Sequence, residues 1–322
     1  MSKTIKVVPI VKKPVYKRNQ VIVYVVVFIA LAATLGLQYR MISPSVTILR
    51  NADKLYVLAA VCLVLFSFVT ATLSYQSLSL KRLVFHRTLL IQVASGFTNR
   101  LLPVGLGGVG LNIKYLMVSG HSFAEASGLA AANNLLGIIG NGLLLLLAAL
   151  VFPQYFNTVQ MPELTNALSP VVITLGLLVI ILILYLYSNN KFTRFSEFLR
   201  GTAVSLRHSL QPSFRSCIAL SSNILLSALN VAALSLVGAA IHVHVSVVIA
   251  LIVLSTGTLL GAAIPTPGGI GGVEVGLVAG LSAFHVSLPA ALATAVLYRF
   301  LTYGLPIIPG FIAFMYIRRL YV

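Results

Sequence analysis

The chain has 322 residues, of which 59% are hydrophobic and only 8% are charged, and its formal net charge at pH 7 is +17. A soluble domain carries about 25% charged residues, so this composition excludes an ordinary soluble domain and indicates a protein whose solvent is a lipid bilayer. We expect no nucleic acid as a partner, because the Lys and Arg residues border apolar segments, as they do beside transmembrane helices, and form no single patch.

The apolar segments, taken in chain order, predict an all-α polytopic membrane protein. Residues 1–20 form a basic N-terminal segment, and the apolar run that follows lacks the small-residue cleavage site of a signal peptide. A helix needs about 20 apolar residues to cross the hydrocarbon. By that measure six segments are full transmembrane helices: 21–39, 55–79, 124–152, 168–187, 216–240 and 289–317.

Two further apolar regions, 89–119 and 246–285, are each divided by a cluster of Pro and Gly residues. The positive-inside rule favours a topology in which each region enters and leaves by the same face of the membrane. Most of the 22 Lys and Arg residues and both termini then lie in the cytoplasm. If only one region crossed, the basic segment 188–216 or the C-terminus would lie outside. We therefore expect two re-entrant broken helical hairpins in a protein integral to the cytoplasmic membrane.

The two Pro/Gly clusters match each other. Residues 102–110 read LPVGLGGVG, residues 266–274 read TPGGIGGVE, and an offset of 164 positions aligns them. Matching broken segments that enter from opposite faces are typical of an inverted repeat with a binding site near the bilayer midplane. A chance match in a Gly-rich protein, or a pair of kinked and tightly packed helices, is the alternative. The residues expected to break the helices are Pro103, Gly105, Gly107, Gly108, Pro265, Pro267, Gly268, Gly269 and Gly271.

The repeat divides the chain into four parts. The basic connector between the two repeats is expected to be an amphipathic helix on the cytoplasmic surface. The parts are the N-terminus 1–20, a first transmembrane repeat 21–187, the connector 188–215 and a second transmembrane repeat 216–322.

Several ionisable residues fall within apolar segments, where a charge is costly and is a functional candidate by default. Glu274 closes the second cluster, and Arg299, midway through the last span, is its expected counter-ion. Arg100 and Lys114 flank the first cluster, beside Asn99. If the two hairpin tips meet, these groups could line one polar cavity, with the cations binding a phosphate and Glu274 orienting an arginine or contacting an amine. The alternative is a purely structural ion pair, with Arg100 and Lys114 extending to the membrane interface.

The segment 262–314 resembles the C-terminal signature of the lysylphosphatidylglycerol synthase transmembrane, or flippase-like, family. That signature reads P-x-PGG-(I/L)-G-x-x-E and is followed by a Tyr-Arg pair in the last long span. In this chain it comprises Pro265, Pro267, Gly268, Gly269, Ile270, Gly271, Glu274, Tyr298 and Arg299. The segment 97–108, FTNRLLPVGLGG, is similar to the first half of the family, and the resemblance covers roughly residues 20–317.

The chain departs from the family pattern in its first half. Leu111 stands where members usually carry Glu, the basic position is Lys114, and Asn133 and Asn134 replace a Glu-Arg pair. These changes partly neutralise the first polar site. We also expect no aminoacyl-transferase domain, so the resemblance implies the stand-alone membrane domain and no lysyl transfer.

The resemblance and the residues together favour a lipid flippase that moves a phospholipid or a polyprenyl-phosphate-linked lipid through a midplane polar cavity. The alternative is a non-transporting membrane subunit or anchor that partners a separate glycosyl- or aminoacyl-transferase. We expect no enzyme, cofactor or metal site, because the sequence shows no paired carboxylates, metal cluster or nucleophile–base set. A homo-oligomer is compatible with the sequence. The residues expected to bind substrate are Asn99, Arg100, Lys114, Glu274, Tyr298 and Arg299.

Overall fold

The computed structural model describes residues 47–79, 81–100, 106–156, 192–209, 211, 213–263, 266 and 268–321. All regular structure in these residues is helical. The N-terminal segment 1–20 and the predicted spans 21–39 and 168–187 lie outside the described residues.

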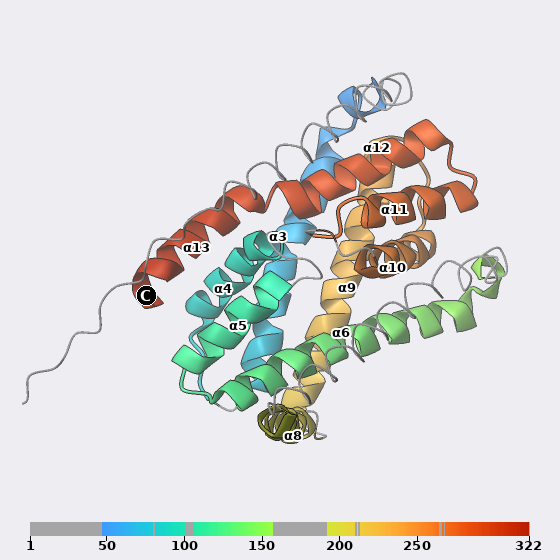
Figure 1. The fold of residues 1–322 in the computed structure, drawn as a ribbon. Helices are drawn as coiled ribbons and strands as arrows, with labels where there is room; N and C mark the ends of the chain where they lie inside the picture. Colours follow the sequence, from blue (N-terminus) through green and yellow to red (C-terminus); the bar gives the residue numbers. More distant parts are fainter. Residues whose placement is uncertain are drawn as a thin grey trace, which may run out of the picture. The chain divides into compact units, whose positions relative to one another are not determined.

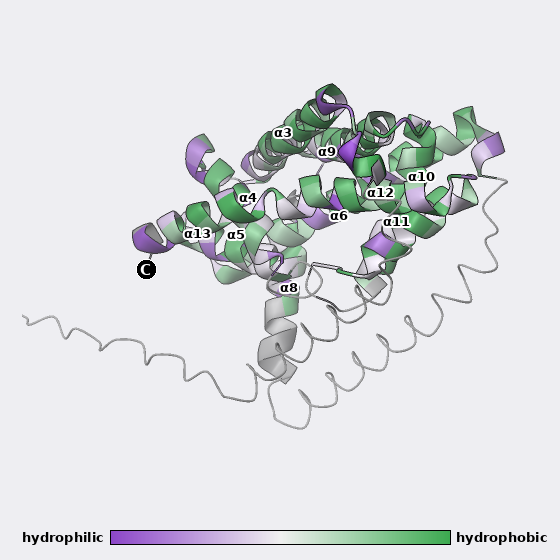
Figure 2. Ribbon diagram, turned by 90° about the horizontal axis from the view of Figure 1, so that it is seen from above, coloured by the Kyte–Doolittle hydropathy of each residue, from purple (hydrophilic) through white to green (hydrophobic). Residues whose placement is uncertain are grey.

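Four helical segments are long and apolar enough to cross a membrane, which confirms four of the predicted spans and shows an integral membrane protein. They are α3 (Lys54–Leu78), α6 (Phe123–Val151), α9 (Phe214–Ala240) and the joined helices over Leu288–Arg319. The starts of α3, α6 and α9 follow from local capping, in which a side-chain oxygen accepts an otherwise unpaired backbone N–H. Asp53 accepts the Leu55 N–H, and Ser122 forms a capping box with Glu125. Figure 2 shows that these helices are hydrophobic along most of their length.

The two interrupted regions form two pairs of short helices. The first pair is α4 (Phe85–Thr98) and α5 (Leu106–Val118), and the second is α10 (Val247–Ala263) and α11 (Gly272–Ala283). At 1.5 Å per residue these helices are about 18–26 Å long, shorter than a hydrocarbon core of about 30 Å. In each pair the first helix ends before the Gly-rich part of the Pro/Gly cluster and the second begins within the cluster, so each apolar region is interrupted where predicted. We refer to them below as the first and second hairpins, and to the segments joining their helices as the tips.

The long helices α3 and α9 pack against each other, and each hairpin packs against one half of the last span (Figure 1). The first hairpin contacts α13 (Ile307–Tyr321) through α4, and the second contacts α12 (Leu288–Arg299) through α11. The buried apolar side chains form two clusters accordingly. One centres on Leu234, Leu277 and Leu281, and the other includes Ile91 and Leu116.

The connector forms α8 (Phe192–Ser209), which packs on the start of α6. The Ser205 hydroxyl donates to the Glu125 carbonyl at 3.3 Å. A helix in the connector was predicted, and its contact with α6 fixes where the chain re-enters the bundle before α9.

The last span, predicted over 289–317, contains a π-helical turn that the sequence analysis did not anticipate. A π-helical turn, η2 (Phe300–Gly304), separates α12 from α13, and the Leu305 N–H donates to the Phe300 carbonyl at 2.7 Å. Pro306 has no N–H for the Thr302 carbonyl four positions earlier, so the regular helical ladder cannot continue. Such turns are frequent at functional sites.

Candidate functional site

The tip of the second hairpin is held by an ion pair. Arg299 Nε donates to Glu274 Oε1 at 2.6 Å, which confirms the predicted pairing, and Arg299 Nη2 donates to the Gly268 carbonyl at 3.1 Å. The other carboxylate oxygen, Glu274 Oε2, accepts the Gly271 N–H at 2.7 Å at the start of α11. Glu274 therefore caps its own helix and binds the last residue of α12 at the same time. Its side chain is 32% exposed and that of Arg299 15% exposed, so the pair is only partly shielded.

The glycines of the second tip meet two separate needs. Gly268, Gly269 and Gly271 have φ of +64°, +68° and +89°, a region that other residues rarely adopt. At Gly268 a Cβ atom would also overlap the ring of Tyr303. Glycine thus lets the tip lie directly against η2.

The first tip is closed by a neutral amide. Asn99 Oδ1 accepts the Gly108 N–H at 2.6 Å, near the start of α5. A Cβ atom at Gly107 would overlap the Thr98 carbonyl oxygen, and one at Gly108 would overlap the Asn99 amide. The predicted role of these glycines in close helix approach is therefore seen, between the end of α4 and the start of α5.

Arg100 extends from the first tip to the bend in the last span. Its Nε donates to the Tyr303 carbonyl at 2.5 Å and its Nη2 to the Thr302 carbonyl at 2.9 Å. The Thr302 carbonyl is one that Pro306 leaves without a regular helical donor. The arginine of the first hairpin therefore stabilises the interruption at which the second hairpin also docks.

Tyr303 joins the two arginines. The guanidinium carbon of Arg100 lies 4.6 Å from the centre of the Tyr303 ring, and that of Arg299 lies 4.5 Å from it. Both distances are within the range of cation–π attraction. The sequence analysis missed Tyr303, although it stands four residues after Arg299 and three before Pro306, so an aromatic on the arginine's helix face beside a helix break was a usable signal.

A cavity of about 340 Å³ opens between the two tips. Val64 and Phe68 stand at the middle of α3, and Asn230 stands near the middle of α9, so the cavity lies about halfway along two helices long enough to span the membrane. The lining residues are Val64, Ser67, Phe68, Gly96, Asn99, Arg100, Asn230, Gly268, Thr302 and Tyr303.

The charges around this cavity favour an anion. Arg100 and Arg299 carry two positive charges against the single carboxylate of Glu274. Arg100 lines the cavity directly, and contacts with the described residues occupy two of the five N–H donors of its guanidinium. The remaining donors suit a phosphate or carboxylate oxygen, since guanidinium binds both through paired N–H groups.

Of the six predicted substrate-binding residues, Asn99 and Arg100 line the cavity, and Glu274 and Arg299 form their ion pair beside it without lining it. The other two lie away from the cavity. Lys114 is exposed on α5 and lines a different pocket, and Tyr298 is buried in the apolar cluster around Leu234 and Leu277. The cluster residues Pro103, Gly105, Pro265 and Pro267 lie outside the described residues.

Two asparagines in this region, Asn112 next to Leu111 and Asn133, form neutral hydrogen bonds between helices. Gln92 Nε2 donates to Asn112 Oδ1 at 2.8 Å, and Ser74 Oγ donates to Asn133 Oδ1 at 2.6 Å while accepting from Asn223 Nδ2 at 2.8 Å. Buried amides and hydroxyls thus bind one another between helices.

Comparison with known families gives a match over nearly the whole chain. The family model described as the lysylphosphatidylglycerol synthase TM region matches residues 21–310. Comparison with curated proteins gives no match.

Proposed function

The chain belongs to the lysylphosphatidylglycerol synthase transmembrane family, and on that premise we propose that it is a lipid flippase, moving the anionic headgroup of a phospholipid or polyprenyl-phosphate-linked lipid across the cell membrane. The family places the chain among lipid-related membrane domains. The main observation in favour of transport is the cavity with polar lining residues halfway along α3 and α9, with Arg100 in its wall.

The cavity lowers the main barrier to lipid translocation. A phosphate at the centre of a bilayer loses its hydration, and charged groups there cost several kcal/mol. Arg100 offers a positive charge and N–H donors at that depth, and Asn99 and Asn230 add polar surface. A cavity of about 340 Å³ is within the range of about 300–1,000 Å³ that small-ligand sites occupy. The acyl chains stay in the surrounding lipid, so only the headgroup needs a polar path.

In this proposal the two hairpins are re-entrant and form an inverted repeat, one entering from each face. The helix lengths support it, because α4, α5 and α11 are, over their described residues, too short to cross alone and α10 is at the lower limit of length for a spanning helix. A rocking of one hairpin against the bend at η2 would then expose the cavity to alternate sides. Both termini lie in the cytoplasm, and the chain acts without catalysis of its own.

In this proposal each residue at the two tips has a role that follows from its position. Arg100 binds the headgroup phosphate, and Asn99 holds the tip that presents it. Glu274 and Arg299 keep the second tip against Tyr303, so that the cavity has a wall on that side. Glu274 also neutralises Arg299. The positive charge of Arg100 then remains to attract one anion without holding it irreversibly.

Reconstitution into liposomes tests the proposal directly. Purified protein is incorporated into the liposomes together with a fluorescent phospholipid. The fraction of the fluorescence that a membrane-impermeant quencher removes from outside reports transfer between leaflets. We expect transfer above protein-free liposomes, and a rate at least tenfold lower for Arg100→Gln. Arg50→Gln is the matched control, because it removes the same charge from an exposed residue outside the cavity.

Two results would reject parts of the proposal. If the wild-type protein gives no transfer with anionic, zwitterionic or polyprenyl-phosphate probes, transport is wrong and a membrane subunit that partners a separate transferase becomes the better interpretation. If transfer occurs but Arg100→Gln and Glu274→Gln leave its rate unchanged, the lipid takes another path.

A further inference from the structure

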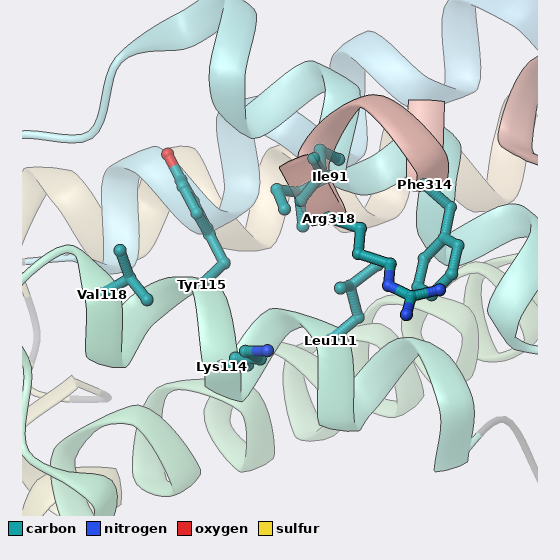
Figure 3. Close-up of a pocket in the computed structure, with 8 residues that line it drawn as sticks. Ile91, Leu111, Lys114, Tyr115, Val118, Phe314 and Arg318 are labelled. Atoms are coloured by element: carbon teal, nitrogen blue, oxygen red, sulfur yellow. The ribbon is translucent and has the colours of Figure 1, made fainter. Parts of the chain in front are cut away.

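A second pocket, of about 200 Å³, lies between α4, α5 and α13, apart from the central cavity (Figure 3). It shares no lining residue with the cavity between the tips. Most of its wall is apolar, and two cations complete it. Its lining residues are Ile91, Leu111, Lys114, Tyr115, Val118, Phe314, Ile317 and Arg318.

The two cations are exposed, whereas the deeper wall is buried. Lys114 and Arg318 are solvent-accessible, while Ile91, Tyr115 and Ile317 are between 1% and 6% exposed. Tyr115 presents only its ring, because its hydroxyl is hydrogen-bonded to Thr88 at 2.8 Å. Figure 3 shows the Lys114 ammonium and the Arg318 guanidinium bordering the same opening, on α5 and α13. The pocket therefore has an apolar interior and a positively charged opening.

Neither cation forms an ion pair with any residue that the structure describes. The carboxylates of described side chains cap helices elsewhere: Asp53 binds the Leu55 N–H, Glu125 the Ser122 N–H and Glu274 the Gly271 N–H. Two cations at one opening, without a carboxylate partner among the described side chains, attract a negative group.

The pocket lies near helix ends, not at the midplane. Lys114 is four residues from the end of α5, and Arg318 is three residues from the end of α13. Arg82 and Arg87, near the start of the antiparallel helix α4, are exposed as well. Basic pockets between transmembrane helices at this level suit lipid headgroups.

We propose that this pocket binds one anionic phospholipid from the membrane, with its phosphate between Lys114 and Arg318 and one acyl chain against Ile91, Leu111 and Phe314. Hydrocarbon tails are as apolar as the pocket wall, so moving a chain into it gains little. Selectivity therefore comes from headgroup charge, and the apolar wall only accommodates the chain. A lipid bound there bridges the first hairpin and α13, and the proposal stands whether or not the protein transports lipid.

Native mass spectrometry of the full chain tests this by counting retained lipids. The detergent-purified protein is equilibrated with equal amounts of phosphatidylglycerol, which carries one net negative charge and no amine, and phosphatidylcholine. We expect one phosphatidylglycerol to be retained preferentially. Lys114→Gln and Arg318→Gln should each lower that preference about fivefold, and together about twenty-five-fold. Arg319→Gln is the control, because it removes the same charge one residue beyond the pocket.

A blocking variant separates this site from a general effect of surface charge. Val118→Phe fills the opening from an exposed position and leaves both cations in place, and it should abolish the preference while the thermal unfolding of the protein stays the same. If Arg319→Gln acts as strongly as Arg318→Gln, or if glycerol phosphate displaces the lipid, the proposal is wrong, because diffuse charge or a soluble anion then explains the binding. Equal retention in all variants would likewise overturn it, because the lipid would then bind elsewhere. If the wild-type protein retains no phosphatidylglycerol, the proposal is also wrong, and another part of the chain or a second copy becomes the better occupant.

Discussion

The two hairpins carry the same Pro/Gly motif but dock on the last span in opposite ways. In the second hairpin the span supplies the cation, because Arg299 of α12 reaches Glu274 and the Gly268 carbonyl at the tip. In the first hairpin the tip supplies the cation, because Arg100 reaches the Thr302 and Tyr303 carbonyls of η2. Both tips therefore contact the same bend, η2.

The difference shows that the docking geometry is preserved while the chemistry changes. The second tip closes its short helix with a carboxylate, and the first closes its helix with the neutral amide of Asn99. A carboxylate without a cation is costly in a membrane, whereas an amide needs only hydrogen bonds. The second hairpin should consequently be the more sensitive of the two to loss of a single partner.

The largest expected effect is at the ion pair. Arg299→Ala leaves Glu274 unpaired and removes the bond to Gly268, and we expect it to lower the free energy of unfolding by about 3 kcal/mol, at the lower end for a broken buried pair because this one is partly exposed. A titration with denaturing detergent measures the change. In the double variant Glu274→Gln/Arg299→Met no charge is left unpaired, so more than half of the loss should return. If the losses instead add, the two side chains are not coupled.

The next effect separates two reasons for glycine at one motif position. Gly107 and Gly271 are aligned by the offset of 164 positions between the two motifs. A Cβ atom at Gly107 would overlap the Thr98 carbonyl, whereas at Gly271 it would meet open space at a φ of +89°. Gly107→Ala should cost about 2 kcal/mol through overpacking, and Gly107→Ser more. Gly271→Ala should cost roughly 1.5 kcal/mol through backbone strain, and Gly271→Ser the same.

Gly110→Ala is the matched control for that series. This glycine lies within α5 and a Cβ atom there would have nothing within 4 Å. Alanine is the better helix former, so unfolding measured in the same way should show a gain of up to about 1 kcal/mol. A loss at Gly110 comparable to that at Gly107 would mean that the first hairpin tolerates no side chain for some reason other than contact between α4 and α5.

The sequence predicted the parts of this arrangement that depend on composition and spacing. The length of the apolar segments was sufficient to predict the four described spans. The Pro/Gly clusters were sufficient to predict where both helix pairs are interrupted. The pair of Glu274 and Arg299 followed from the cost of a lone charge in lipid. Each of these expectations rests on a local property of the chain.

What the sequence could not supply was the direction in which side chains point. Arg100 and Lys114 both flank the first cluster, but Arg100 enters the central cavity and Lys114 faces a separate pocket with Arg318. Tyr298 is next to Arg299 yet points into the core. The π-helical turn at η2 rotates the residues that follow, and it depends on Pro306 together with the tertiary contact from Arg100.

A smaller effect is expected at the neutral cap. Asn99→Ala removes the acceptor of the Gly108 N–H, and we expect a loss of about 1.5 kcal/mol, within the range of helix N-caps. Unfolding in denaturing detergent again provides the measurement, with Asn134→Ala, an exposed position on α6, as a control that should change stability by less than about 0.5 kcal/mol. A loss at Asn99 as large as that at Arg299 would contradict the contrast between a neutral and a charged tip.

The smallest expected effect is at Tyr303, the ring that both arginines contact. Tyr303→Leu keeps apolar volume but removes the aromatic face, so we expect a loss of about 1 kcal/mol from two partly exposed cation–π contacts. Tyr303→Phe keeps the face and should leave stability unchanged. The informative measurement combines each Tyr303 variant with Arg100→Gln and with Arg299→Ala, because a shared ring should couple to both arginines. Coupling to only one of them would show that the two hairpins dock on the bend independently. If that one is Arg299, the first tip is held there by the Thr302 and Tyr303 carbonyls alone.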